Sequence, residues 1–125
     1  MRGTPEGREN VVLDKSYAFA LAVIDAYKKM VAQRELVLSK QLLRCGTSIG
    51  ANVEEAQAAQ STRDFISKLS IACKEARESR YWLRLLDRSS LCNIDFNPLL
   101  SQVEELIRLL CSILKSVSKR LTAKG

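Results

Sequence analysis

The chain has 125 residues, of which 46% are hydrophobic and only 6% aromatic, and it contains two prolines and five glycines. This length fits one domain with an aliphatic core, and the scarcity of turn-forming residues argues against a β fold. The formal charge of +6 permits a polyanionic partner, whereas the absence of histidine argues against a zinc or haem site.

The N-terminal segment, residues 1–10, is polar and contains two glycines and a proline. This composition predicts a flexible leader, and the lack of an apolar run argues against a signal peptide. A first helix is predicted from Val11 to about Gln33–Glu35. Its expected core face follows alternating steps of four and three residues, which keep these side chains on one side: Leu13, Tyr17, Ala20, Ile24, Tyr27 and Val31.

A second helix is predicted to begin at Ser39, whose hydroxyl suits an N-cap. Gly46 and Gly50 lie inside this helix, although each glycine costs about 1 kcal/mol relative to alanine. The expected core positions pass through the glycines without a change of phase, which favours a continuous helix that another backbone approaches closely. A helix break near Gly46–Gly50 is the alternative. The expected core positions are Leu42, Gly46, Ile49, Val53 and Ala56.

A third helix is predicted from about Thr62 to about Ser90, because Ser61 and Asp64 have the spacing of a capping box. Only a few residues separate it from the second helix, so the two helices are expected to form an antiparallel hairpin. The core stripe expected on the third helix consists of Phe65, Leu69, Ala72, Ala76, Leu83 and Leu86.

A fourth helix is predicted after Asn97, which suits a cap, with Pro98 at the first helical position. It should run to about Leu121, before a frayed tail at residues 122–125. Its expected core residues are Leu99, Val103, Leu106, Leu110, Ile113, Val117 and Leu121. Four amphipathic helices with short connections predict an all-α fold, an antiparallel up-down-up-down four-helix bundle that forms a single domain over residues 11–121.

The third helix carries a second partly apolar stripe, well away from its expected core face. Ile71, Trp82 and Leu85 lie in this stripe together with Glu75 and Glu78. Because a monomeric bundle has little use for a tryptophan there, these three apolar residues are predicted to form a self-association interface. The alternative is that Trp82 folds back onto the first helix or the tail of its own subunit.

A third stripe on the same helix is basic. It consists of Arg63, Ser67, Ser70, Lys74, Arg77, Tyr81, Arg84 and Arg88, at heptad spacing and without a carboxylate. Such a stripe is predicted to contact the phosphates of RNA or DNA, with Arg63, Lys74, Arg77, Tyr81, Arg84 and Arg88 as the binding residues. The alternative is a solvated face on which the arginines pair with Glu75, Glu78 or Asp87.

Reaction chemistry is missing from the sequence. No P-loop is present, no cysteine has a histidine partner, and no Glu-x-x-His pattern exists, so neither an enzyme, a metal site nor a cofactor is expected. Ser48, Asn52 and Glu55 share one flank of the second helix and are predicted to form a polar network that fixes register; a ligand site is the alternative.

The four cysteines, Cys45, Cys73, Cys92 and Cys111, are widely spaced and include no CxxC pair. They are expected to be small buried hydrophobic residues of a cytoplasmic protein, where thiols stay reduced. No run of residues approaches the ~18 consecutive apolar residues of a membrane span, so no membrane association is expected.

Residues 41–86 resemble a bacterial four-helix-bundle family whose founding members are encoded in intervening sequences of 23S rRNA genes. The matching pattern is R-x-x-x-S-I-x-x-N followed by an acidic residue and alanine, which here is Arg44, Ser48-Ile49, Asn52 and Glu55-Ala56. The runs D-F-I-x-K-L and Y-W-L-x-L-L also match. The detailed match covers about a third of the chain, and the four-helix layout covers nearly all of it.

The resemblance implies an antiparallel four-helix bundle that assembles into a homopentameric ring and has no assigned enzymatic activity. It also implies a relation to the accessory variability determinant of diversity-generating retroelements, a basic pentamer that binds nucleic acid and a reverse transcriptase. The leading prediction is therefore a non-enzymatic, oligomeric bundle that binds the RNA or DNA backbone. The alternative is a protein-interaction scaffold or accessory subunit, for example for a reverse transcriptase.

Overall fold

The computed structural model describes the backbone of residues 4–124 and the side chains of residues 11–123. Four helices account for most of this range, and no strand occurs in it: α1 (Thr4–Ala32), α2 (Leu38–Ala56), α3 (Thr62–Ser89) and α4 (Asn97–Lys124). The predicted all-α, four-helix fold is confirmed. None of the helices within residues 4–124 has the length and apolar content needed to cross a bilayer.

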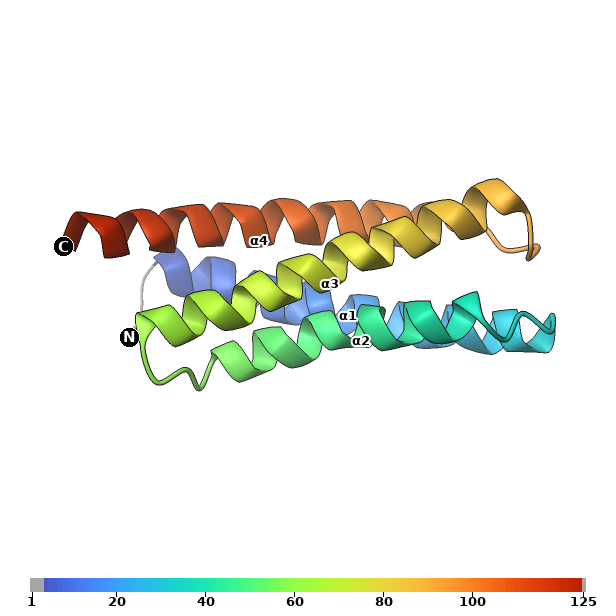
Figure 1. Cartoon of the computed structure of the whole chain (residues 1–125), viewed down its shortest axis with the longest axis horizontal. Helices are drawn as coiled ribbons and strands as arrows, with labels where there is room; N and C mark the ends of the chain where they lie inside the picture. The colour runs from blue at the N-terminus through green and yellow to red at the C-terminus, as the bar shows by residue number, and fades with distance from the viewer. Residues whose placement is uncertain (1–3, 125) are drawn as a thin grey trace.

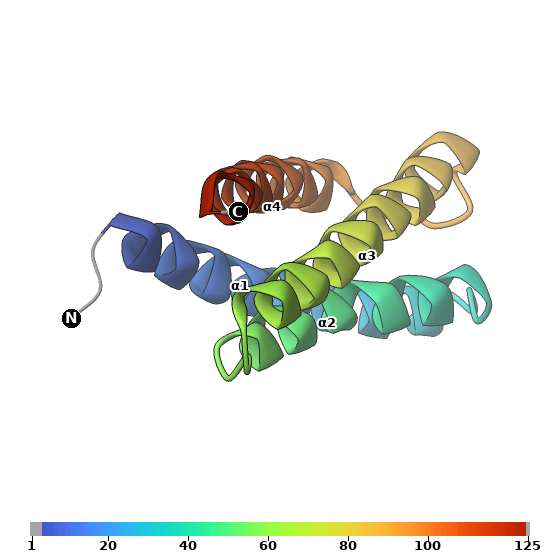
Figure 2. The same ribbon diagram turned by 60° about the vertical axis from the view of Figure 1, so that its left-hand side comes forward.

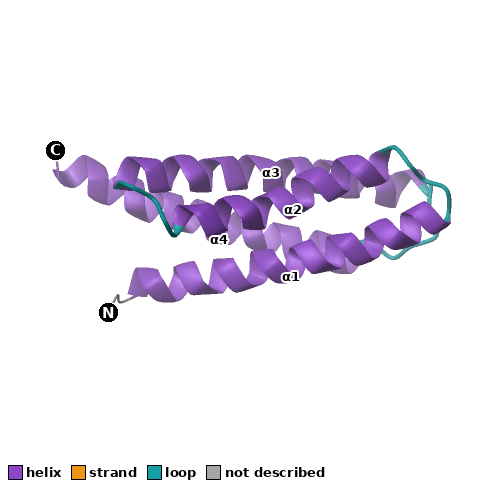
Figure 3. Cartoon of the chain, turned by 90° about the horizontal axis from the view of Figure 1, so that it is seen from below, coloured by secondary structure: helices purple, strands orange, loops and turns teal. Residues whose placement is uncertain are grey.

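Each helix packs against the next one along the chain, and α4 also packs against α1. The α1–α2 and α3–α4 connections lie at one end of the molecule, and the α2–α3 connection lies at the other end with both termini (Figure 1). The three connections are short and keep to the ends of the molecule (Figure 3). In Figure 2, α3 runs obliquely to α2, and the start of α1 diverges from α4.

Helix α1 begins at Thr4, seven residues before the predicted start at Val11, so that prediction of the helix start was wrong. Pro5 explains the difference, because a proline in the first turn of a helix lacks only an N–H that has no partner there anyway. Residues 4–10 of the predicted leader are helical backbone, and residues 1–3 lie outside the described residues. At the other end, α4 continues past Leu121 to Lys124.

The predicted core face of α1 was also wrong. Tyr17 is 67% exposed, and the buried residues form a neighbouring series rotated away from the predicted one: Val12, Ser16, Phe19, Val23, Ala26 and Met30. Both series are largely apolar at helical spacing, so periodicity alone could not choose between them. The choice depends on which series fits α2.

The turn between α1 and α2 is capped by a carboxylate and not by Ser39, contrary to prediction. Glu35 accepts hydrogen bonds from the backbone N–H groups of Val37, Leu38 and Ser39, at 3.1, 3.2 and 2.6 Å. The Ser39 hydroxyl instead donates to the Glu35 carbonyl oxygen at 2.7 Å. Because the carboxylate lies at the positive end of the helix dipole and satisfies three donors, it replaces a hydroxyl cap.

Helix α2 is continuous through both glycines, as predicted, and α1 lies directly against them. A Cβ atom at Gly46 would lie 2.9 Å from Val23 Cγ2, which is too close for two carbon atoms. A Cβ atom at Gly50 would lie 3.4 Å from the Ser16 carbonyl oxygen, which is an ordinary contact. Gly46 is therefore required for the close approach of α1, and it explains why Val23 belongs to the core.

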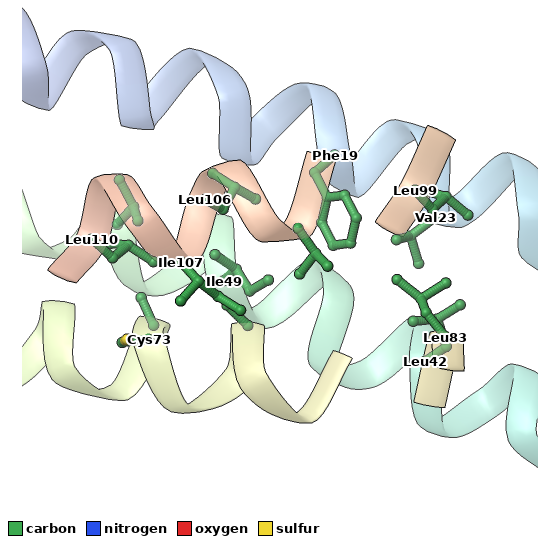
Figure 4. Packing of buried hydrophobic residues seen from close by; sticks show 14 of the residues in the cluster. Phe19, Val23, Leu42, Ile49, Cys73, Leu83, Leu99, Leu106, Ile107 and Leu110 are labelled. Carbon is green, nitrogen blue, oxygen red and sulfur yellow. The ribbon is translucent and has the colours of Figure 1, made fainter. Parts of the chain in front are cut away.

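The remaining helices follow the predicted pattern closely. Ser61 accepts a hydrogen bond from the Asp64 backbone N–H at 3.0 Å, which confirms the predicted cap at the start of α3. Most predicted core positions of α2, α3 and α4 are buried, with Phe65 and Leu121 only partly covered. Phe19, Ile49, Leu83 and Leu106 point into one shared interior (Figure 4). Cys45, Cys73 and Cys92 are buried as expected, whereas Cys111 is partly exposed.

Candidate nucleic-acid interface

The predicted basic stripe lies on the solvent side of α3, where its residues recur at heptad spacing. All six predicted binding residues are exposed: Arg63, Lys74, Arg77, Tyr81, Arg84 and Arg88. The Tyr81 ring packs edge-on against the Trp82 ring, with centroids 5.1 Å apart and planes inclined by 67°. The stripe therefore presents five cations and one fixed aromatic ring to solvent.

Two of the three carboxylates that could have neutralised this stripe, Glu75 and Glu78, belong to a different cluster. Glu78 pairs with Arg44 of α2, and Glu75 lies 3.6 Å from the Arg44 guanidinium. The Trp82 indole N–H also donates to Glu78 at 3.1 Å. These hydrogen bonds, first the one from Trp82 and then the one from Arg44, lower the pKa of the Glu78 carboxyl group. Among residues 11–123, neither Glu75 nor Glu78 pairs with a cation of the stripe.

The polar residues of α2 lie on the flank that faces α3. The Asn52 side-chain amide donates to the Ser48 carbonyl oxygen at 2.9 Å and approaches the Ser48 hydroxyl at 3.1 Å. Glu55 pairs across the helix interface with Lys68 of α3 at 2.9 Å. Along the α2–α3 seam, both Arg44 and Lys68 are therefore paired with carboxylates of the facing helix.

The α3–α4 seam has a different charge pattern. Arg80 pairs with Glu104 at 3.2 Å, and the Arg77 guanidinium donates to the Cys111 sulfur at 3.6 Å. Arg108 and Lys115 are exposed and lie four residues after Glu104 and Cys111, so they project from the α3-facing side of α4. No ion pair to either residue occurs within the described part of the chain.

Arg108 and Lys115 extend the basic stripe across the seam onto a second helix. We call the resulting surface the basic face, and it consists of Arg63, Lys74, Arg77, Tyr81, Arg84, Arg88, Arg108 and Lys115. Sequence reasoning missed the two α4 residues. Their heptad spacing with Glu104 and Cys111 places all four on one face of α4 but does not show that this face meets α3. The basic face is two helices wide, and most of its cations have no ion pair among residues 11–123.

The three residues predicted to form a self-association interface are only partly exposed to solvent. Ile71 and Leu85 are each 38% exposed, whereas Trp82 is half-buried and packs against the core. A larger exposed apolar surface lies on α1, where sequence reasoning had expected core. We call it the α1 apolar surface, and its exposed residues follow helical spacing: Tyr17, Leu21, Ile24 and Val31.

A hollow of about 180 Å³ lies between α1 and the start of α4. Its charged lining residues are Asp25, Lys29 and Asp95, and Asp25 pairs with Lys29 at 3.3 Å. It contains no cysteine or serine that could act as a nucleophile. Among the described residues, no group of three or more acidic or cysteine side chains has the proximity needed to hold a metal ion.

Comparisons with known proteins agree with this architecture. The sequence profile of a family described as 23S rRNA-intervening sequence protein matches residues 8–112. A crystal structure of a protein of unknown function from the S23 ribosomal protein family of Bacteroides thetaiotaomicron is similar over 86% of this chain and 98% of its own length. The two share 49% sequence identity, and the TM-score is 0.83. No curated protein matches this chain.

Proposed function

The chain belongs to the family of 23S rRNA-intervening sequence proteins, and we propose that it binds the backbone of RNA or DNA through its basic face, without catalysing a reaction. The observation that carries this proposal is the separation of charge between two seams. Arg44 occupies Glu75 and Glu78 on the α2–α3 side, so that Arg63, Lys74, Arg84 and Arg88 are left without an ion pair among the described residues.

Binding of this kind should depend on charge and not on base sequence. Exposed arginine and lysine side chains contact phosphates and release the counterions that surround them. Tyr81 adds an exposed ring on which an unpaired base can stack. The residues of the basic face are all exposed, so they would contact the nucleic acid at the surface of the protein, and we expect little sequence preference.

The double variant Arg77→Glu with Arg84→Glu tests the basic face. We expect its affinity for a single-stranded RNA oligonucleotide to fall at least about ten-fold, and the slope of log affinity against log salt to decrease by roughly 2. Fluorescence anisotropy across a salt series, with a DNA oligonucleotide in parallel, measures both quantities.

The matched control is Arg34→Glu with Lys40→Glu, which changes the net charge equally at exposed positions in the α1–α2 turn and near the start of α2. This control should keep most of the affinity, because its loss of charge lies away from the basic face. Equal losses in both variants would mean that net charge alone matters. An affinity that does not respond to salt would contradict phosphate binding altogether.

We also propose that the protein forms a closed homo-oligomer, with five copies as the resemblance implies. The protomer of this ring would be the antiparallel, up-down-up-down bundle, since successive turns lie at opposite ends of the molecule. A ring requires two different complementary surfaces on each protomer. The α1 apolar surface and the partly exposed stripe of Ile71, Trp82 and Leu85 are two such surfaces. Each copy would also add a basic face to the ring.

Light scattering coupled to size exclusion tests this assembly. We expect the wild-type protein to have five times the 14.0 kDa mass of one chain. Leu21→Glu should reduce this mass, because it places a charge within the α1 apolar surface. Leu91→Glu is the matched control, since both leucines are more than half exposed but Leu91 lies in the α3–α4 turn.

A second candidate function is that of an interaction scaffold or accessory subunit, for example for a reverse transcriptase. The α1 apolar surface favours this candidate as well, because it could bind a different protein. A wild-type species of 14.0 kDa at micromolar concentration would contradict the ring and leave this surface for another partner.

A further inference from the structure

The seam between α3 and α4 contains two cysteines whose sulfur atoms lie close together. Cys73 Sγ and Cys111 Sγ are 3.8 Å apart, although the residues are 38 positions apart in sequence. Cys73 is only 8% exposed, whereas Cys111 is partly exposed at the surface of the seam. The two other cysteines differ from this pair: Cys45 is fully buried and accepts a hydrogen bond from Ser79, and Cys92 lies in the α3–α4 turn.

We propose that Cys73 and Cys111 form a reversible dithiol–disulfide pair that links α3 to α4, with a small-molecule disulfide of the glutathione type as the oxidant. The two sulfur atoms are in van der Waals contact at 3.8 Å and would have to approach to the bonded separation of about 2 Å. Both cysteines lie on helices that pack side by side, so the bond would join two neighbouring helices of one chain.

The exchange would occur in two steps. The Cys111 sulfur, as a thiolate, attacks one sulfur of the small disulfide, and the other sulfur leaves as a thiolate and takes up a proton. The Cys73 sulfur then attacks Cys111 Sγ in this mixed disulfide and displaces the second small thiol. Overall, two protein thiols lose two electrons and two protons, and one small disulfide becomes two small thiols.

The exposure of the two sulfur atoms favours this order of attack, since Cys73 is buried and Cys111 is partly exposed. Arg77 Nη2 lies 3.6 Å from Cys111 Sγ, so a cation stands beside the sulfur atoms over which negative charge spreads during exchange. Burial raises the pKa of the Cys73 thiol and the neighbouring Cys111 raises it further, while Arg77 acts in the opposite direction. Cys111, the more exposed sulfur, meets the oxidant first, and Cys73 completes the bond.

The test uses the full chain in glutathione buffers that range from fully reduced to fully oxidised. Samples are quenched with acid and alkylated in denaturant, and the modified thiols are counted and mapped by mass spectrometry. We expect two of the four thiols to disappear in oxidising buffer, with the peptides of Cys73 and Cys111 joined within one chain. We expect dithiothreitol to restore all four thiols.

Thermal unfolding gives a second measurement. A bond that closes a loop of this length should raise Tm by roughly 5–15 °C relative to the reduced protein. Cys111→Ser should abolish both the loss of thiols and the rise in Tm, while Cys92→Ser should retain both. Four free thiols in every buffer, or a bond that joins two chains or involves Cys45, would overturn the proposal. These results do not depend on nucleic-acid binding, so the two proposals can fail separately.

Discussion

Replacing Phe19 by alanine should lower the free energy of unfolding by about 3–5 kcal/mol. Phe19 is fully buried, and its ring points from α1 into the interior shared with Ile49 and Leu106 (Figure 4). Truncation removes the transfer free energy of the ring and leaves a cavity that helices on all sides cannot fill. Urea denaturation followed by circular dichroism measures this loss.

Tyr17→Ala is the control, since Tyr17 lies two residues away on the same helix and is 67% exposed. Its cost should stay within about 0.5 kcal/mol, as for most surface substitutions. Because Tyr17 belongs to the α1 apolar surface, both variants should be measured at two protein concentrations, which separates any contribution of self-association. If Tyr17→Ala were as costly as Phe19→Ala at both concentrations, the orientation of α1 described above would be wrong.

Gly46→Leu should destabilise the protein by about 3 kcal/mol, even though leucine has the higher helix propensity. The first side-chain carbon alone would meet Val23 Cγ2 at 2.9 Å, and valine, being β-branched, has few other rotamers to adopt. The α1 and α2 backbones must therefore move apart, which loosens packing along both helices.

Gly50→Ala separates this steric effect from helix propensity. The new methyl group would lie 3.4 Å from the Ser16 carbonyl oxygen, and the helix would gain up to about 1 kcal/mol of propensity. We therefore expect urea denaturation to show an unchanged or higher free energy of unfolding for Gly50→Ala and a lower one for Gly46→Leu. A stabilised Gly46→Leu variant would show that α1 does not approach α2 closely at this point.

The start of α3 and the apolar faces of three helices could be predicted because each depends on residues close in sequence. Ser61 and Asp64 form their cap within a single helical turn. On α2 the apolar residues gather on one face, so the sequence alone indicates which face of the helix is buried. Helix α1 has two apolar series, so its orientation depends on contacts with Gly46 that local sequence does not contain. The Glu35 cap was missed because it forms only when the backbone of the α1–α2 turn brings the N–H groups of Val37, Leu38 and Ser39 to the Glu35 carboxylate.

The candidate site also has one part that the sequence could predict and another that depends on contacts between helices. Heptad spacing was sufficient to predict the cations of α3, since residues on one helix face share that face whatever surrounds them. It could not show that Arg44 occupies Glu75 and Glu78, because that pairing crosses from α2 to α3. It also could not show that Arg108 and Lys115 flank the same seam.

The sequence by itself determined that this protein is a four-helix chain with a basic stripe on its third helix, because periodicity, capping and charge spacing act within one helix. Only the tertiary structure decided which side of α1 is buried and which carboxylates form ion pairs with Arg44. It alone also decided that the sulfur atoms of Cys73 and Cys111 lie in contact. Each of these features joins residues on different helices. Their distances depend on how the helices pack, which no single helix specifies.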